Sequence, residues 1–470
     1  MPHPLLVRSD SGAHPIWFVG DETWKEIRER LPAQAVRFAE AQGFEPNAGR
    51  HCLLPTADGS LLGVLFGIGA ASAQRPDPFL VGKLPTLLPE GTYSFATGPA
   101  EPVLATLAWL LGGYVFTRYG KKAAKPVRLV APDGVDAAEI AAIAEAVATG
   151  RDLVNMPAND LGPDGLEAAA RRLADKHGAA VEVIVGDDLL ARNFPMIHAV
   201  GRASATPPRL IDIRRGAPGD PRVTLVGKGV TFDTGGLNIK PDAAMLLMKK
   251  DMGGAAAALA LAEMIMAADL PIRLRILVPA VENMISGASF RPGDVLKSRK
   301  GLTVEIGNTD AEGRLILADA LALADEEEPE LLVDFATLTG AARVALGPDL
   351  PPFYTEDDGL AADLARLGEA VNDPVWRLPL WPPYAPLLDS KVADINHISG
   401  GPFAGSITAA LFLRRFATAA RAHVHFDVYA WNPKAQPGRP EGGEVQAARL
   451  VYALLKERYG AAGGRTMVRG

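Results

Sequence analysis

Apolar runs with the length of strands alternate with longer Ala- and Leu-rich runs in the second half of the chain. Arg222–Gly227, Ile272–Val281 and Glu330–Thr337 have the aliphatic composition of buried strands. Gly253–Ala268 and Leu315–Asp325 have the length and apolar spacing of helices. This alternation favours an α/β fold in which a mixed central sheet is flanked by helices on both faces.

The chain has 470 residues, which is too long for one ordinary hydrophobic core, so two domains are expected. In the first part, Leu61–Gly67 and Val127–Ala131 are expected strands and Val103–Tyr119 is an expected helix. The expected divisions are a smaller N-terminal α/β domain at 1–130, a connecting helix at 131–150 and a larger C-terminal α/β domain at 151–470.

Charge and cysteine content exclude several classes of protein. The net charge of −7 gives no support to nucleic-acid binding, and the single cysteine, Cys52, excludes a disulfide framework or a cysteine-ligated zinc site within the chain. The start of the chain lacks the regions of a signal peptide. Val103–Phe116 and Ala255–Met266, the most apolar stretches, are shorter than the roughly 20 residues that span a bilayer. A cytoplasmic protein without a membrane segment is expected.

The segment Asn308–Leu315 reads Asn-Thr-Asp-Ala-Glu-Gly-Arg-Leu. If it is extended, Asp310, Glu312 and Arg314 point to the same side, because side chains alternate along a strand. Two carboxylates that face one point repel each other unless a cation lies between them, and divalent metal ions are the usual partners of oxygen clusters. An Asp-x-Glu pair alone is more often a solvated surface feature, so the prediction depends on further ligands.

Two further aspartates lie near the ends of expected strands. Asp233 follows Arg222–Gly227 in the sequence Phe-Asp-Thr-Gly-Gly, and Asp251 precedes the Ala-rich helix. In open α/β sheets, ligands bind beyond the carboxyl ends of the strands. Asp233, Asp251, Asp310 and Glu312 together carry four negative charges, which two divalent cations would balance.

Three basic residues complete the expected cluster. Lys228 directly follows a strand, and its amine could serve as a nitrogen ligand, because a bound metal lowers the pKa of an amine. Lys240 and Arg314 would remain as cations, which in a hydrolase stabilise the oxyanion that forms on the scissile carbonyl. The charge balance therefore favours a two-metal hydrolase. A phosphate-binding loop at Lys228 is disfavoured, because the required Gly-x-x-x-x-Gly-Lys-Ser/Thr motif is absent from the sequence there.

These motifs resemble the leucyl (cytosol) aminopeptidase family of two-metal metallopeptidases. The resemblance covers roughly residues 150–440, and the segment 308–315 matches the family motif completely. The other matching elements, in family order, are Gly227–Gly229, Phe232–Gly236, Lys240-Pro241, Asp251–Ala255, Ala336–Ala341 and Ala404–Ala410. The N-terminal part resembles the family only loosely, and in this family that domain is macro-like.

The resemblance implies two divalent metal ions per subunit, manganese or zinc, with magnesium and cobalt as alternatives. One ion would be held by Lys228, Asp233, Asp251 and Glu312. The other would be held by Asp233, Asp310 and Glu312, so that Asp233 and Glu312 bridge the pair. A water or hydroxide bound to both metals would attack the peptide carbonyl. The free α-amine of the substrate would bind one metal, which restricts cleavage to the N-terminal residue.

The resemblance also implies catalytic and substrate-binding roles. Lys240 would polarise the scissile carbonyl, and Arg314 would hold a bicarbonate ion that acts as general base. The residues expected to contact the substrate are Met248, Thr337, Leu338 and Gly340. They would border an apolar pocket that suits leucine-like side chains. Tyr429 and Trp431 stand where the family usually has small residues, so they could narrow or reshape this pocket.

The expected function is therefore metal-dependent removal of N-terminal, leucine-like residues from peptides, in a homohexamer. Two alternatives remain open: a dipeptidase of the cysteinylglycine type with the same site, and a non-catalytic binding protein on the same fold. His397, His423 and His425 are tempting as ligands, but the family uses no histidine, so all eight histidines are left out of the site.

Overall fold

The computed structural model describes residues 3–9, 11–70, 77–120 and 123–460. The chain divides into two compact units, of which the first comprises Met1–Ala148 and Lys434–Glu441 and the second comprises Thr149–Pro433 and Gly442–Gly470. The domain limits expected from the sequence, with a connecting helix at 131–150 between the two domains, stay a prediction. In the described part of the chain, no helix combines the length and apolar character needed to cross a bilayer.

The first unit contains a six-stranded sheet with the order β1-β6-β5-β2-β4-β3, in which β3 is antiparallel to β4 and the other neighbours are parallel. The strands are β1 (Leu6–Val7), β2 (His14–Gly20), β3 (His51–Pro55), β4 (Leu61–Gly69), β5 (Gly91–Phe95) and β6 (Val127–Val130). The helices are α1 (Trp24–Arg30), α2 (Ala33–Ala41), the 3-10 helix η1 (Leu80–Lys83), α3 (Leu84–Leu87) and α4 (Pro102–Gly112). The strands expected at 61–67 and 127–131 are confirmed.

The helix expected at Val103–Tyr119 is shorter than predicted, because α4 ends at Gly112. Glycine is a poor helix former, and a second glycine, Gly113, follows it. A Cβ atom at Gly112 would lie 2.0 Å from the carbonyl oxygen of Gly82. The chain therefore needs glycine here so that the end of α4 can pack closely against η1.

The second unit contains a nine-stranded mixed sheet with the order β16-β15-β18-β14-β9-β11-β8-β7, to which β10 is added by pairing with β11. The strands are β7 (Ala180–Val185), β8 (Arg209–Arg215), β9 (Arg222–Gly227), β10 (Gly229–Asp233), β11 (Arg273–Asn283), β14 (Leu331–Ala336), β15 (Pro352–Tyr354), β16 (Trp376–Arg377) and β18 (His423–Asp427). The central strands β11, β9, β14 and β18 are parallel. The expected mixed α/β sheet and its three expected strands are confirmed.

Two small sheets lie outside the main one. They are formed by β12 (Val295–Lys297), β13 (Thr303–Glu305) and β17 (Ile395–Asn396), and by β19 (Trp431–Asn432) and β20 (Gly442–Gly443). The helices of the second unit, with the last part of α5 (Ala137–Asn155), are α6 (Pro163–His177), α7 (Asp188–Ala191), α8 (Pro195–Gly201), α9 (Asp242–Met245), η2 (Met248–Met252), α10 (Gly253–Ala267), η3 (Thr309–Ala311), α11 (Gly313–Asp325), α12 (Gly340–Leu346), α13 (Asp358–Ala370), η4 (Pro382–Leu388), α14 (Gly405–Arg414) and α15 (Ala448–Tyr459).

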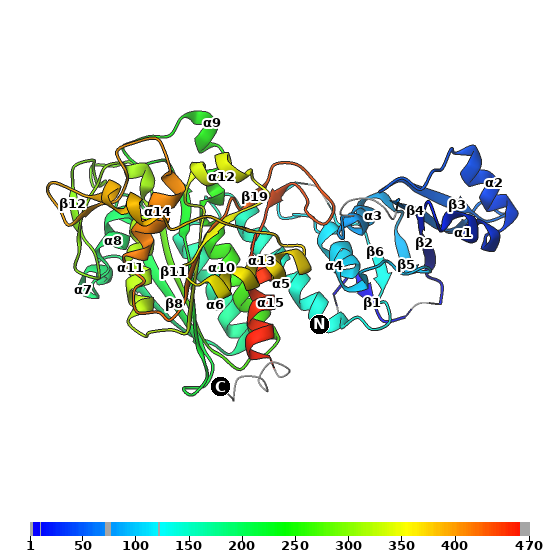
Figure 1. The fold of residues 1–470 in the computed structure, drawn as a ribbon, viewed down its shortest axis with the longest axis horizontal. Helices are drawn as coiled ribbons and strands as arrows, with labels where there is room; N and C mark the ends of the chain where they lie inside the picture. The colour runs from blue at the N-terminus through cyan, green and yellow to red at the C-terminus, as the bar shows by residue number, and fades with distance from the viewer. Residues whose placement is uncertain (1–2, 10, 71–76, 121–122, 461–470) are drawn as a thin grey trace. The chain divides into compact units, whose positions relative to one another are not determined.

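Helices cover both faces of the nine-stranded sheet (Figure 1). The helices α8, α11 and α14 pack together on one face, where they share an apolar core with Val226, Leu277 and Leu332. The helices α10, α15, α6 and α13 form the second group, and α10 packs directly on β9 and β14. Because side chains alternate across a strand, an aliphatic run such as that of β9 fills both cores.

Helix α10 starts against the carboxyl end of the sheet because its first residues are glycines. A Cβ atom at Gly254 would lie 2.1 Å from the carbonyl oxygen of Phe335 in β14. The helix is buried nearly all round, which matches its run of alanine and other apolar residues. This close contact helps to place Asp251, two residues before the helix, beside Lys228 after β9 and Thr337 after β14.

A buried ion pair joins the end of α5 to the segment before α15. Arg151, which is 1% exposed, donates from Nη2 to Glu444 Oε2 at 2.8 Å and from Nε to Oε1 at 3.3 Å. Burial alone would raise the pKa of Glu444, but the charge and hydrogen bonds of Arg151 lower this pKa to about 2. The carboxylate is therefore held in its ionised form within the second unit.

We expect Glu444→Gln to lower the free energy of unfolding by about 3–5 kcal/mol at pH 7, because Arg151 loses its buried countercharge. The native pKa lies below the ordinary value of 4.5, so the contribution is present above pH 4.5 and is lost as the pH falls towards 2. Urea unfolding of both proteins between pH 7 and pH 3.5 measures the difference. A difference that stays constant with pH would contradict this assignment.

Candidate active site

The carboxyl ends of neighbouring parallel strands carry the expected site residues. Lys228 directly follows β9, Asp233 ends β10, and Thr337 directly follows β14. Asp251 lies in η2, and Glu312 lies between η3 and the start of α11. The parallel arrangement of β10, β11, β9 and β14 brings these ends to one edge of the sheet.

The structure brings the five expected metal ligands and Lys240 together. Lys228 Nζ lies 2.7 Å from Asp251 Oδ2 and 3.0 Å from Glu312 Oε1. Lys240 Nζ lies 2.8 Å from Asp233 Oδ2 and also pairs with Asp310. One carboxylate oxygen from each of Asp233, Asp310 and Glu312 lies within 4.8 Å of the others.

The oxygens of this cluster have the character of metal ligands. Asp251 Oδ2, Asp310 Oδ1 and both carboxylate oxygens of Glu312 are buried and accept no hydrogen bond from the described residues. Lysine amines lie within ion-pair distance of three of these oxygens. Glu312 Oε2 has no such partner in the described part of the chain, although Glu312 is only 1% exposed. Because buried carboxylates need compensation, hard divalent cations fit this donor set.

Burial and mutual repulsion shift the pKa values of the cluster. Burial and the charge of Asp233 raise the pKa of Glu312 to about 8. Burial and the charge of Asp251 raise the pKa of Asp233 to about 6. Burial would lower the pKa of Lys228, but the carboxylates around it, Asp251 first, raise it well above its usual value. The protein alone therefore does not supply enough positive charge to keep every carboxylate ionised.

The backbone of the segment 308–315 differs from the expected extended form. Asn308 caps a 3-10 turn at Thr309–Ala311 by accepting a hydrogen bond from Asp310 N at 2.8 Å, and α11 begins at Gly313. Asp310 and Glu312 still reach one cluster, but through a helical turn and not through strand alternation. The expectation of an extended segment was wrong because the Asn308 side chain stabilises the turn.

Arg314 is buried on the first turn of α11 and donates from Nη1 to the carbonyl oxygen of His397 at 2.7 Å. Its Nε has no hydrogen-bond partner among the described residues. Burial lowers the pKa of this guanidinium to about 10, so Arg314 keeps its charge at neutral pH. Arg314 is absent from the described lining of the cavity, whereas Lys240 is part of it.

A cavity of about 480 Å³ opens onto the cluster. Its lining includes five carboxylate and lysine residues of the cluster, Lys228, Asp233, Lys240, Asp251 and Asp310. It also includes all four expected substrate-contacting residues, Met248, Thr337, Leu338 and Gly340. Tyr429 also lines the cavity, as expected, but Trp431 does not belong to the described lining. Trp431 instead packs against Lys249, whose Nζ lies 5.6 Å from the ring centre.

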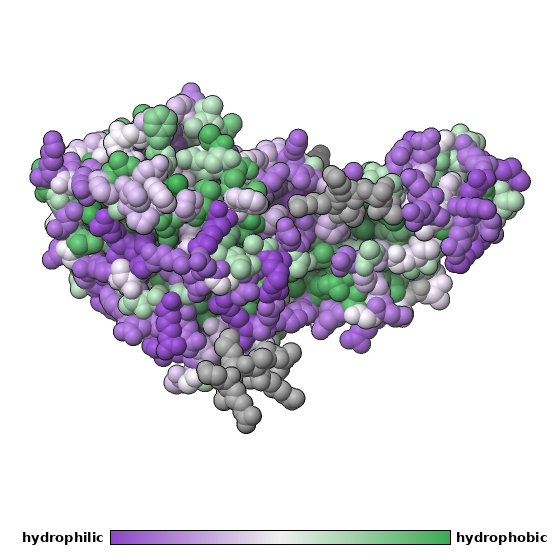
Figure 2. Space-filling view, in the orientation of Figure 1, coloured by the Kyte–Doolittle hydropathy of each residue, from purple (hydrophilic) through white to green (hydrophobic). Residues whose placement is uncertain are grey.

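Hydrophobic residues gather around α9 and α12 on the surface of the second unit (Figure 2). Leu246, which follows α9, and Val344 in α12 are 86% and 83% exposed. The same elements contribute Ala243, Ala244 and Arg343 to the cavity lining. Elements that line the cavity therefore also carry exposed apolar side chains.

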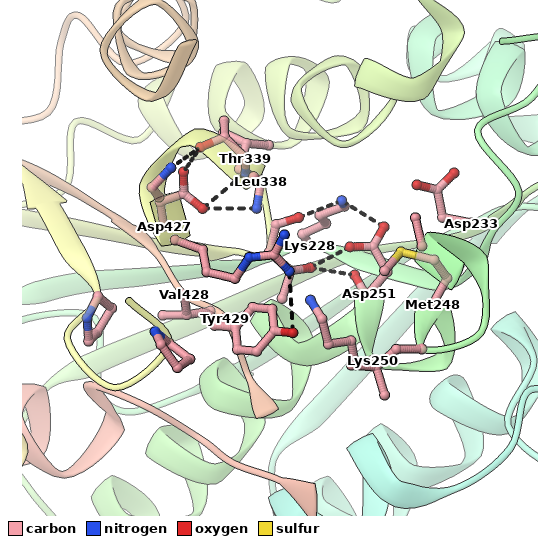
Figure 3. A pocket seen from close by; sticks show the side chains of 18 of the residues that line it. Lys228, Asp233, Met248, Lys250, Asp251, Leu338, Thr339, Asp427, Val428 and Tyr429 are labelled. Atoms are coloured by element: carbon pink, nitrogen blue, oxygen red, sulfur yellow. Dashed lines mark hydrogen bonds and ion pairs between the residues drawn. The ribbon is translucent and has the colours of Figure 1, made fainter. Parts of the chain in front are cut away.

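Residues that the sequence analysis did not identify hold the site in place. Asn283 donates from Nδ2 to Asp233 Oδ1 at 2.8 Å and to the carbonyl oxygen of Thr309 at 3.1 Å. Asp427 Oδ1 accepts hydrogen bonds from Leu338 N at 3.0 Å and Thr339 N at 3.1 Å (Figure 3). Both residues end strands of the main sheet, which is the signal that could have pointed to them.

The three tempting histidines make other contacts. His397 Nε2 lies 2.9 Å from the carbonyl oxygen of Asn308, and burial, with the charge of Arg314, lowers its pKa to about 3. His423 Nε2 and His425 Nδ1 lie 2.7 and 2.5 Å from the carboxylate of Asp334. None of the three belongs to the described lining of the cavity.

Comparisons with known proteins agree with this geometry. Residues 148–452 match the cytosol aminopeptidase family, catalytic domain, and residues 18–132 match the M17 aminopeptidase, N-terminal domain. This chain belongs to the cytosol aminopeptidase family. The expected family and enzyme class, a peptidase among the hydrolases, are thereby confirmed.

Several relatives share much of the chain. A probable cytosol aminopeptidase of Roseiflexus castenholzii is 39% identical over 408 residues, which is 83% of each protein. One of Syntrophotalea carbinolica is 44% identical over 318 residues, which is 67% of this chain but 64% of that protein. The crystal structure of the cytosol aminopeptidase of Coxiella burnetii is 43% identical and superimposes with a TM-score of 0.92, covering 97% of this chain and 99% of that one.

A second solved structure is the bottromycin maturation enzyme BotP in complex with Mn, which is 33% identical with a TM-score of 0.85 and covers 95% of this chain and 99% of that one. Membership of a metal-dependent peptidase family agrees with the acidic cluster of Asp233, Asp310 and Glu312. The chain is therefore a metal-dependent member of the family.

Asn283 provides a test of how Asp233 is held. We expect Asn283→Ala to weaken the affinity for Mn²⁺ by about 10- to 100-fold, because an outer residue that orients a ligand has an effect of this size. Calorimetric titration of metal-free protein with Mn²⁺ measures the change, and the thermal unfolding midpoint checks that the variant is folded. Unchanged affinity in the folded variant would show that Asn283 does not orient a metal ligand.

Proposed function

We propose that this protein is a two-metal aminopeptidase that removes N-terminal residues from peptides. The observation that carries the proposal is the convergence of Lys228, Asp233, Asp251, Asp310 and Glu312 on one buried cluster beside a cavity. With Lys228 as a neutral amine, the four carboxylates of this cluster carry a charge of −4, which two divalent cations would balance. Lys228 would become a ligand as its neutral amine.

Two ions would share the cluster. Lys228, Asp233, Asp251 and Glu312 would hold the first, and Asp233, Asp310 and Glu312 the second. When bound, such ions act as Lewis acids that polarise a carbonyl and make water a strong nucleophile at neutral pH. Manganese is supported by the relative solved with Mn, and zinc, magnesium and cobalt fit the same oxygen-rich donor set.

Lys240 would act on the scissile carbonyl. Its Nζ lies among Asp233 and Asp310 at the floor of the cavity. Burial alone would lower the pKa of Lys240, but the charges of Asp233 and then Glu312 raise it above its usual value, so the amine stays protonated. A fixed ammonium there can donate a hydrogen bond to the oxyanion as it develops, and its charge needs no reorganisation during the reaction.

Arg314 would hold a bicarbonate ion as general base, as the family resemblance implies. Its guanidinium keeps its charge and has an Nε without a hydrogen-bond partner among the described residues. A planar guanidinium suits a planar oxyanion of this kind. Glu312 lies two residues before Arg314, so an anion held by Arg314 would lie near the cluster.

The loop after β14 would align the substrate backbone. Its residues Leu338 and Gly340 line the cavity, and Asp427 fixes the loop by accepting hydrogen bonds from Leu338 N and Thr339 N. The Leu338 carbonyl and the Gly340 amide would pair with the peptide. The free α-amine of the substrate would meet the cluster of carboxylates and metals, which explains selection of N-terminal residues, since an internal residue has no free amine.

Leucine-like preference is expected from the resemblance, and Met248 and Thr337 offer apolar contacts for it. The charged residues Lys250 and Arg343 line the same cavity and would influence which substrate side chains it accepts. A dipeptidase of the cysteinylglycine type stays the alternative within this chemistry. A homohexamer in the cytoplasm, with peptides as the partners and no role in nucleic-acid binding, completes the proposal.

The proposal is tested by restoring metal to metal-free protein. We expect Mn²⁺, Zn²⁺, Mg²⁺ or Co²⁺ to restore hydrolysis of leucine p-nitroanilide, while N-acetyl-leucine p-nitroanilide stays intact because its amine is blocked. Glu312→Ala, which lacks a bridging ligand, should stay inactive with every metal. Release of p-nitroaniline measures both. Equal cleavage of the acetylated substrate, or normal turnover by Glu312→Ala, would contradict the proposal.

Lys240→Ala should lower kcat by about 10²–10³, the loss seen when one oxyanion donor is removed. Steady-state kinetics with leucine p-nitroanilide measure this change, and metal content must be compared because Lys240 also contacts Asp233 and Asp310. A variant with full metal content and a change in KM alone would make Lys240 a ground-state binding residue.

A further inference from the structure

Two cations of the cavity lie against one aromatic ring. Lys250 Nζ lies 4.5 Å from the centre of the Tyr429 ring, and the Arg343 guanidinium lies 5.2 Å from it. Arg343 Nη1 also donates to the Tyr429 hydroxyl at 3.3 Å. Figure 3 shows the Lys250 side chain beside the Tyr429 ring. All three members of this group, Lys250, Arg343 and Tyr429, line the cavity.

Neither cation makes an ion pair with an acidic residue in the described part of the chain. The other lysines of the site differ in this respect, since Lys228 pairs with Asp251 and Glu312, and Lys240 pairs with Asp233. Lys250 is nonetheless only 6% exposed. A buried ammonium without a carboxylate is unfavourable, and contact with an aromatic face offsets this only in part.

The nearest acids are already engaged. Asp251 pairs with Lys228 and accepts a hydrogen bond from Thr337 Oγ1 at 2.7 Å. Asp427 accepts hydrogen bonds from the backbone of Leu338 and from Thr339. These acids therefore serve the cluster and the substrate loop, and the positive charge beside Tyr429 faces the cavity without a dedicated partner.

We propose that Lys250 and Arg343 bind a carboxylate of the peptide substrate, so that the enzyme favours peptides with an acidic N-terminal residue. This inference rests on the proposed aminopeptidase function. The pocket expected for the first side chain is bordered by Met248 and Thr337, and Lys250 lies two residues after Met248 in the same short helix. An aspartate or glutamate side chain there would supply the missing negative charge.

The same chemistry has a second source, the free C-terminal carboxylate of a dipeptide. A leucine side chain would instead cover two cations without replacing their hydration, which is unfavourable. A site built around a charged group rejects analogues that lack the matching charge more strongly than an apolar pocket rejects a change in size. Substrate charge should therefore dominate substrate choice in this enzyme.

Binding of a side-chain carboxylate is tested with aminoacyl p-nitroanilides, because these substrates carry no C-terminal carboxylate. We expect kcat/KM for glutamate p-nitroanilide to exceed that for the neutral isostere glutamine p-nitroanilide by about 10- to 100-fold, the range expected for hydrogen bonds to charged groups. Lys250→Met and Arg343→Met should each reduce this ratio at least several-fold, while leucine p-nitroanilide remains a substrate. That retained activity shows that the variants fold and hold metal.

Lys249→Met is the matched control. Lys249 neighbours Lys250 but donates to the carbonyl oxygen of Asn155 at 2.7 Å and does not belong to the described lining of the cavity. The ratio of glutamate to glutamine substrates should not change in this variant. A loss equal to that of Lys250→Met would mean that general charge near the site, and not direct contact, sets the preference, which overturns the proposal.

The C-terminal source is tested with Leu-Gly and Leu-Gly amide. A preference for Leu-Gly that is lost in Lys250→Met assigns the carboxylate to the end of a dipeptide. If glutamate is not preferred over glutamine, and Leu-Gly is not preferred over its amide, while leucine p-nitroanilide is cleaved, then the carboxylate proposal is overturned and the aminopeptidase proposal stands. Failure to cleave any substrate with a free amine would remove the aminopeptidase proposal as well.

Discussion

The rest of the site depends on the repulsion among four carboxylates that are gathered at one edge of a sheet. Asp233, Asp251 and Glu312 are at most 4% exposed, so water cannot screen their charges. Lys228 and Lys240 offset part of this repulsion. Burial, together with the repulsion that remains, raises the pKa values of Asp233 and Glu312 to about 6 and 8. The site therefore carries excess negative charge, which divalent cations would neutralise.

The fold makes this arrangement possible by bringing backbone close to backbone. The start of α10 contacts β14 through Gly254, and this contact places Asp251 beside Lys228. Asn283 at the end of β11 connects Asp233 to Thr309, and so to the segment that carries Asp310 and Glu312. The cluster is thus held by the rigid parts of the second unit and not by a single loop, as a preorganised site requires.

The central elements and the proposed ligands could be predicted from the sequence because each leaves a local pattern. The aliphatic composition of Arg222–Gly227 indicates a strand, and that of Gly253–Ala267 indicates a helix. The acidic site residues could be identified because they lie near the ends of expected strands. The 3-10 turn after Asn308 was not predicted, because a side-chain cap changes the backbone from extended to helical over only a few residues, which is too short for a clear sequence pattern. The role of Asn283 and the grouping of Lys250 with Tyr429 join residues far apart in the sequence, so no local pattern records them.

The central claim is that these side chains hold two metal ions in each chain. Elemental analysis of protein dialysed against a small excess of Mn²⁺, combined with calorimetric titration of the metal-free protein, tests it most directly. The account predicts two bound ions per chain in the native protein and fewer in Glu312→Ala. A native stoichiometry of one or none, or two ions bound equally well by Glu312→Ala, would contradict it.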